Sequence, residues 1–293
     1  MRQEFITISN YRIRLLEDGT SNSKHIILLH GIGAAAERWA KVMPLLARDY
    51  HVIAPDIIGF GYSDKPDVSY TMRLFTSFVR DLASTLGIRR FSLMGSSLGG
   101  QIAAEFAIAY GSDMLNSLVL VTPSGMSVEP TQAFTQYIMA ALYPNLETAR
   151  RAFMLMHCGK PVDEIYLRDF VNRMMLPNAK YAFISTLMGM REAASNFKER
   201  LHKISVPTLI IWSERDLLIP VEHAYEFQRR ISNSNLIIMD GCGHIPFYEQ
   251  PEKFVDMVTN FIESVLASYN LLAISPICPQ LYTLSILSSL ETW

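Results

Sequence analysis

The residues best suited to chemistry lie in one short stretch, in which Ser97 stands between Gly95 and Gly99. Residues 91–96 form an apolar run typical of a strand, and the small and apolar residues that follow are typical of a helix. A serine at an abrupt strand-to-helix turn projects above the strand end, and its neighbours must be small because the two backbones nearly touch. The pattern predicts a nucleophilic hydroxyl at Ser97. The alternative is a loop rich in Gly and Ser that carries no chemistry.

A serine hydroxyl is a weak nucleophile, so it needs an adjacent base and a third group that orients the base. Of the seven histidines in the chain, only His30 and His244 follow expected strand ends within Gly-rich loops. His244 comes late in the chain, and Asp216 lies between it and Ser97, also after a strand. We therefore take His244 as the candidate base and Asp216 as the candidate acid. The alternative for His244 is a capping or core histidine.

The elements that must position these residues alternate between strands and helices. Apolar runs typical of buried strands occur at residues 25–29, 51–56, 117–121, 206–212 and 235–239. Helical periodicity occurs at residues 37–49, 72–86, 221–231 and 252–267. Residues 5–15 alternate as an antiparallel hairpin. This order predicts a mostly parallel sheet, whose ligands bind beyond the carboxyl ends of the strands, where the three candidates would meet.

A helical segment interrupts this alternation. Residues 125–197 contain no convincing strand but eight methionines: Met126, Met139, Met154, Met156, Met174, Met175, Met188 and Met190. We predict a core in two parts, residues 1–124 and 198–267, with residues 125–197 inserted as a helical cap over the rim of the sheet. Residues 268–293 form a C-terminal extension of unknown structure, for which loose packing, an interface and an altered terminus all stay open.

Taken together, the motifs resemble those of the α/β-hydrolase superfamily from residue 5 to residue 267. The matching stretches are His30-Gly31-Ile32-Gly33, Pro55-Asp56, Gly59-Phe60-Gly61-Tyr62-Ser63, Gly95-Ser96-Ser97-Leu98-Gly99-Gly100, Trp212-Ser213-Glu214-Arg215-Asp216, Ile219-Pro220 and Gly243-His244-Ile245-Pro246. The resemblance implies the α/β-hydrolase fold, with a mostly parallel central sheet, helices on both faces and an inserted helical cap. It implies Ser97 as nucleophile, Asp216 as acid and His244 as base, in the chain order of that family. It also implies an oxyanion hole formed by the backbone N–H groups of Ile32 and Leu98.

Other polar residues near these motifs compete for the same roles. Glu214 lies on the same loop as Asp216, but Asp216 matches the family position of the acid. Asp56 is expected to be structural and to hold the loop of residues 59–63, as Asp often does in turns. His30 is expected to shape the oxyanion loop and not to act as a base.

A serine at the turn argues against the dehalogenases and epoxide hydrolases of this superfamily, which use aspartate there. We predict a serine hydrolase that cleaves a carboxylic ester of a small to medium apolar substrate through an acyl-enzyme. A methionine-rich cap would make an adaptable apolar pocket, with Met154 and Met188 as candidate determinants of acyl length. One alternative is a C–C bond hydrolase of meta-cleavage products, a group that typically has tryptophan where this chain has Ile245. The other is a non-catalytic receptor for a small ligand on the same fold.

Composition excludes several other classes of function. The chain has 26 Lys and Arg against 28 Asp and Glu, so no general positive field would attract nucleic acid. Its three cysteines, Cys158, Cys242 and Cys278, show no metal-binding spacing, and we expect no metal or cofactor. The scattered cysteines and an N-terminus without an apolar leader predict a cytoplasmic protein. No run of apolar residues is long enough for a membrane span.

Overall fold

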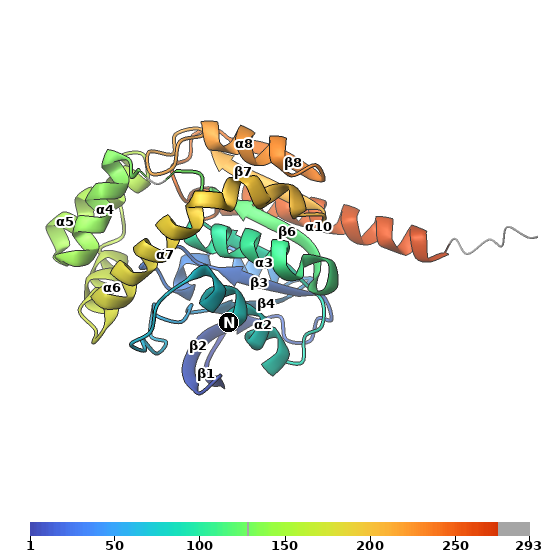
Figure 1. Ribbon diagram of the computed structural model, residues 1–293, viewed down its shortest axis with the longest axis horizontal. Coiled ribbons are helices and arrows are strands. Elements are labelled where there is room, and N and C mark those ends of the chain that lie inside the picture. The colour runs from blue at the N-terminus through green and yellow to red at the C-terminus, as the bar shows by residue number, and fades with distance from the viewer. Residues whose placement is uncertain (128, 275–293) are drawn as a thin grey trace, which may run out of the picture.

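The computed structural model of the protein describes residues 1–127 and 129–274. Its strands form one eight-stranded sheet in the order β1-β2-β4-β3-β5-β6-β7-β8 (Figure 1). They are β1 (Arg2–Ile8), β2 (Tyr11–Asp18), β3 (His25–Leu29), β4 (His51–Pro55), β5 (Phe91–Ser96), β6 (Leu115–Val121), β7 (Thr208–Ser213) and β8 (Ser234–Met239). The pairs β1–β2 and β2–β4 are antiparallel, and every other pair in this sheet is parallel. The predicted hairpin and mostly parallel sheet are confirmed.

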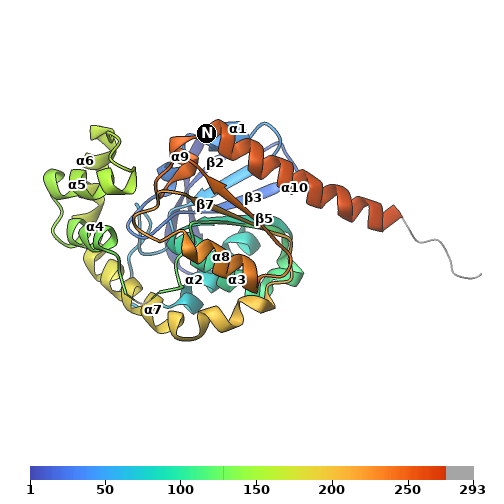
Figure 2. The same cartoon turned by 90° about the horizontal axis from the view of Figure 1, so that it is seen from above.

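Helices cover both faces of the sheet, as predicted. Figure 2 shows α2, α3 and α8 on one face and α1 and α10 on the other. Their bounds are α1 (Met43–Leu46), α2 (Met72–Thr85), α3 (Leu98–Met114), α8 (Glu222–Arg230) and α10 (Pro251–Ile274), with the short α9 at Pro246–Glu249. Strands β5 and β7 are buried along their whole length, which accounts for their continuous apolar runs.

Two helices differ from the prediction for simple reasons. The helix expected at residues 37–49 is two short turns, η1 (Ala36–Trp39) and α1, because Pro44 near the start of α1 cannot continue a preceding helix. The closing helix, expected to end at residue 267, continues to Ile274. No proline occurs in this helix after Pro251, and the next proline is Pro276. The rest of the predicted extension lies outside the described residues.

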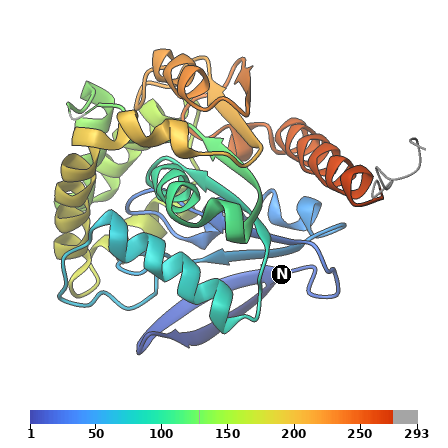
Figure 3. The same ribbon diagram turned by 45° about the vertical axis from the view of Figure 1, so that its right-hand side comes forward.

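A run of helices separates β6 from β7 at the end of the sheet where Ser97 lies (Figures 1 and 3). They are α4 (Gln132–Leu142), α5 (Leu146–Met156), α6 (Glu164–Met174) and α7 (Ala179–Arg200), so the last of them ends three residues beyond the predicted boundary. Polar side chains cap the backbone of the first three: Thr131, Asn145 and Asp163 each accept a hydrogen bond from an N–H in the first turn.

Candidate active site

Ser97 occupies the turn between β5 and α3 in a strained backbone conformation, with φ 56° and ψ −117°. The turn is possible only because its neighbours are glycines. A Cβ on Gly95 would lie 2.0 Å from the carbonyl oxygen of Gly99, and a Cβ on Gly99 would lie 2.2 Å from that of Leu29. The sharp strand-to-helix turn predicted from the sequence is therefore present, with Ser97 just before the N-terminus of α3.

His244 and Asp216 meet beyond the ends of β8 and β7. His244 Nδ1 lies 2.7 Å from Asp216 Oδ2, and both side chains are buried. The other carboxylate oxygen, Oδ1, accepts the N–H groups of Leu218 and Ile219, each at 2.9 Å. Because Asp216 accepts at every contact, His244 carries a proton on Nδ1, and Nε2 is the ring nitrogen that is not bonded to Asp216.

The loop that carries His244 is held from three directions. Thr122 Oγ1 donates to the His244 carbonyl at 3.2 Å, and the His244 N–H donates to the carbonyl of Met156 at 2.8 Å. Glu249 Oε1 accepts the N–H of Gly243 at 2.8 Å. These contacts could not be predicted from residue spacing, because Thr122 and Met156 lie far from His244 in the chain and carry no motif.

The rival carboxylates lie elsewhere. Glu214 is more than half exposed and its nearest cation is Arg215, so it does not contact His244. Asp56 is buried and paired with Arg14 at 2.7 Å, and its Oδ2 also accepts the N–H of Tyr62 at 2.7 Å. The prediction that Asp56 holds the loop of residues 59–63 is confirmed.

The predicted oxyanion loop is fixed by His30. Its Nδ1–H donates to the Gly31 carbonyl at 2.8 Å, and its Nε2 accepts the N–H of Ile57 at 3.0 Å. Burial lowers the pKa of His30 to about 4, so the ring is neutral at pH 7. His30 thus shapes the loop, in agreement with its predicted role. Tyr137 also fixes the loop, since its hydroxyl donates to the Ile32 carbonyl at 2.7 Å.

The backbone N–H groups of Ile32 and Leu98 belong to two segments that border Ser97. Leu98 is the first residue of α3, where an N–H has no acceptor inside the helix. Within the described part of the chain, neither N–H donates to another residue. A Cβ on Gly31 would lie 3.3 Å from Ser97 Cβ, so this loop passes directly beside the serine. The two N–H groups are thus without an acceptor among the described residues, on segments next to the serine.

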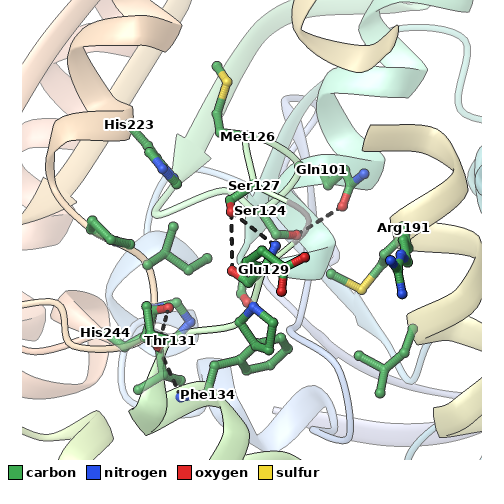
Figure 4. A pocket seen from close by; sticks show the side chains of 18 of the residues that line it. Gln101, Ser124, Met126, Ser127, Glu129, Thr131, Phe134, Arg191, His223 and His244 are labelled. Atoms are coloured by element: carbon green, nitrogen blue, oxygen red, sulfur yellow. Dashed lines mark hydrogen bonds between the residues drawn. The ribbon is translucent and has the colours of Figure 1, made fainter. Parts of the chain in front are cut away.

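A cavity of about 270 Å³ opens next to Ser97 and His244 (Figure 4). Its apolar wall comes from α4, α7 and the loop after β7: Phe134, Ile138, Leu187, Met190, Leu218 and Ile219. Besides Ser97 and His244, its polar groups are Gln101, Ser124, Ser127, Glu129, Thr131, Arg191 and His223, and burial lowers the pKa of His223. A mostly apolar wall with a few polar groups is typical of sites for small organic molecules.

The cap methionines contribute less to this cavity than the sequence suggested. Met154 and Met188, the two expected determinants, are 40% and 69% exposed and line neither cavity beside Ser97. Met126 and Met190 line the larger cavity instead. Helical periodicity cannot tell which face of a helix is turned inward when both faces carry methionine.

A second, smaller cavity of about 20 Å³ also borders Ser97. Its lining includes Gly31, Ile32, Arg38, Ser97, Tyr137 and His244. Arg38 was missed by the sequence analysis, since a lone arginine next to Trp39 in a helical stretch carries no signal of a site.

Across residues 1–127 and 129–274, no group of three His, Cys, Asp or Glu side chains gathers as a metal site would require. In the same part of the chain, no helix has both the length and the apolar content needed to cross a membrane.

Comparisons with known proteins agree with this fold. A family model described as "alpha/beta hydrolase fold" matches residues 24–251. The chain is 30% identical over 271 residues to the 2-hydroxy-6-oxo-6-(2'-aminophenyl)hexa-2,4-dienoic acid hydrolase of Metapseudomonas resinovorans, covering 89% of this chain and 90% of that protein. It is 24% identical to the monoacylglycerol lipase abhd6-A of Xenopus laevis, over 92% and 85% of the two chains. A crystal structure of a membrane phospholipase A, described as a bacterial virulence factor, superposes with a TM-score of 0.80 at 26% identity, over 90% and 86%.

Proposed function

Because this chain belongs to the alpha/beta hydrolase fold family, we propose that it is a serine hydrolase that cleaves a carboxylic ester of a small to medium apolar substrate. The observation that carries the proposal is the pairing of His244 with Asp216 next to Ser97, which stands on a strained turn. The apolar wall of the larger cavity supports an apolar substrate. Lipases among the similar proteins are consistent with an ester.

In the proposed reaction, Ser97 Oγ forms a bond to the ester carbonyl carbon while its proton passes to His244 Nε2. The carbonyl π electrons move to the oxygen, which the N–H groups of Ile32 and Leu98 stabilise. The tetrahedral intermediate then breaks its bond to the alkoxy oxygen, which takes the proton from His244 as the alcohol leaves. Water repeats the sequence on the acyl-enzyme and releases the acid.

The helices inserted between β6 and β7 act in this proposal as a cap that selects the substrate. Support comes from α4 and α7, which supply Phe134, Ile138, Leu187 and Met190 to the wall of the larger cavity. The groups that react with the ester belong to loops at the sheet, so cap residues would change the preferred substrate without changing the chemistry.

The experiment is labelling with a fluorophosphonate probe, followed by peptide mass spectrometry and assays with p-nitrophenyl esters. We expect label on Ser97 and a loss of turnover on the order of 10⁴-fold or more in Ser97→Ala. The control is Ser127→Ala, an exposed serine in the same cavity, which should keep both label and turnover. Label that persists in Ser97→Ala would refute the assignment, and a folded protein that takes no label and turns over no ester would favour the receptor alternative.

A second candidate is hydrolysis of a C–C bond in a meta-cleavage product. It is supported by the relative from Metapseudomonas resinovorans, whose name describes such a reaction and which aligns over nearly the full length of both chains. The same serine, histidine and aspartate would serve. A panel of p-nitrophenyl esters and dienoic acid substrates, compared by kcat/KM, separates the two. A dienoic acid that exceeds every ester by orders of magnitude would replace the ester proposal.

A further inference from the structure

Among the described residues, the guanidinium of Arg38 is a buried positive charge without a counter-ion. Arg38 is only 4% exposed, and its guanidinium lies against aromatic rings, 4.6 Å from the centroid of Tyr166 and 5.5 Å from that of Phe153. Its Nη1 is fully buried and has no hydrogen-bond partner in the described part of the chain. No carboxylate among those residues lies within 4 Å of it. Cation–π contacts compensate only part of the cost of burying a charge, so an unpaired arginine here needs another reason.

The surrounding groups do not neutralise this charge. Arg173, the other buried arginine nearby, is paired with Asp169. Burial and the charge of Arg38 lower the pKa of His157 to about 3, and burial lowers that of His30 to about 4, so both rings are neutral at pH 7.

More distant charged groups do not neutralise the charge of Arg38 either. Lys41 and Lys160 add positive charge on the side of His157. Asp56, which faces His30, is already paired with Arg14. Arg38 therefore contributes a full positive charge to its surroundings.

Arg38 lines the small cavity beside Ser97, together with Ile32 and His244. The cavity volume of about 20 Å³ is room for roughly one water-sized group. A single oxygen fits this space, whereas the three heavy atoms of a carboxylate do not. In an attack by Ser97, the group that turns negative beside the Ile32 N–H is a single oxygen.

We propose that Arg38 supplies a fixed positive charge to this cavity and so stabilises the oxyanion formed when Ser97 attacks an ester. The proposal rests on the ester hydrolase function proposed above. As the Ser97 Oγ–carbon bond forms and the π electrons move to oxygen, the proton of Ser97 goes to His244, and the new negative charge faces Arg38. A buried cation already in place stabilises that charge without reorganisation in the transition state. The charge also explains why an arginine without a partner is buried there.

The experiment compares Arg38→Met, which removes the charge but keeps apolar bulk, with Arg38→Lys, which keeps the charge. With p-nitrophenyl butyrate, we expect kcat and kcat/KM of Arg38→Met to fall together by about 10- to 100-fold, because the lost interaction exists only in the transition state. Affinity for butylboronic acid, which forms a tetrahedral anion on a serine, should fall in parallel. Arg38→Lys should recover most of the catalytic activity and most of the affinity for the boronic acid. Arg12→Met, which removes an exposed arginine stacked 3.5 Å from the centroid of Phe5, is the matched control and should change neither.

Stability separates this role from a structural one. If Arg38 serves only to pack against Tyr166 and Phe153, Arg38→Met should lower Tm. If it supplies charge to the cavity, removing a buried unpaired cation should leave Tm unchanged or raise it while activity falls.

Three results would overturn the proposal. The first is that Arg38→Met retains kcat with the neutral ester, and the second is that its kcat and Tm fall together. The third is that Arg38→Met loses activity only with the mono-p-nitrophenyl ester of glutaric acid, which would make Arg38 a receptor for a substrate carboxylate. Wild-type protein that neither hydrolyses esters nor binds the boronic acid would instead mean that the proposed function has failed.

Discussion

At the scale of single residues, the orientation of His244 depends on Asp216. We expect Asp216→Asn to leave the fold intact and to lower kcat by about 10⁴-fold, because an amide at this position can hold the imidazole in the wrong tautomer and offers no charge to the imidazolium. The backbone N–H groups of Leu218 and Ile219 can still bond to the remaining amide oxygen, which favours a folded variant. Steady-state kinetics with a p-nitrophenyl ester, alongside circular dichroism, measure both effects.

Glu214→Gln is the matched control for this substitution, since it makes the same chemical change on the same loop at an exposed position. It should change kcat little. If Asp216→Asn kept wild-type turnover and Glu214→Gln lost it, the acid assigned to this site would be wrong.

His30 makes the stability of the protein depend on pH. Its pKa is about 4 in the folded protein and about 6.5 in an unfolded chain, so between these values the unfolded state binds more protons. The contribution of neutral His30 to the free energy of unfolding is therefore complete above pH 6.5. As the pH falls toward 4, this contribution decreases by about 3 kcal/mol. Urea unfolding at pH 7 and pH 4 should show a smaller decrease for His30→Gln than for wild type. Equal decreases would contradict this account.

The contrast between Asp216 and Arg38 explains how much of the site the sequence could predict. Asp216, Ser97 and His244 each lie in a recognisable motif just after a strand. Chain order and strand ends were therefore enough to place all three at the carboxyl-end edge of the sheet. Arg38 and Tyr137 act through contacts between distant segments, and neither lies in a motif. Their positions depend on how the inserted helices pack on the sheet, which residue spacing does not encode.

At the scale of elements, one helix of the insertion separates two methionines that look alike in sequence. On α7, Met190 lines the larger cavity, whereas Met188 is 69% exposed. We expect Met190→Ala to shift the preferred acyl length toward longer esters, because the lost side chain leaves space in the wall. Met188→Ala should leave the preference unchanged. The preferred acyl length is measured by kcat/KM for p-nitrophenyl esters from acetate to dodecanoate. Equal losses at every acyl length for Met190→Ala would count against a role of the inserted helices in substrate selection.

Elements were easier to predict than their ends. The strands follow from apolar runs that the core requires, and β3 begins and ends where the pattern placed it. Where helices end depends on local features that periodicity does not resolve, such as Pro44 dividing the helix expected at residues 37–49. The length of α10 was missed because residues 268–274 lack the charged residues that make an amphipathic pattern visible.

At the scale of the whole molecule, the inserted helices are attached directly to the loop of the candidate base. The carbonyl of Met156, at the end of α5, accepts the N–H of His244. A few residues later, Lys160 Nζ donates to the Gly241 carbonyl and to Glu249 Oε2, each at 2.8 Å. Glu249 is buried and also accepts the N–H of Gly243. The segment after α5 therefore holds both sides of His244, so the inserted helices are coupled to the loop of the candidate base.

This coupling predicts a double effect of Lys160→Met. The substitution leaves the Gly243 N–H as the remaining hydrogen-bond donor to the buried Glu249 carboxylate among the described residues, which should lower the free energy of unfolding by about 1–3 kcal/mol. Because the loop of His244 then loses one of its hydrogen bonds to the inserted segment, kcat should fall while KM changes less. Lys160→Arg should restore most of the free energy of unfolding and most of kcat.

Lys253→Met is the control that isolates the effect of burial. Lys253, on α10, forms the same kind of pair with Asp240 of the His244 loop, at 2.8 Å, but Asp240 is 83% exposed. Exposed pairs contribute little, so this variant should stay within about 0.5 kcal/mol of wild type and keep its kcat. Urea unfolding and steady-state kinetics on the same preparations decide the matter. If Lys160→Met matched Lys253→Met in both measurements, the cap would be attached to the sheet without any influence on the base, and selection of substrate would have to act through the cavity wall alone.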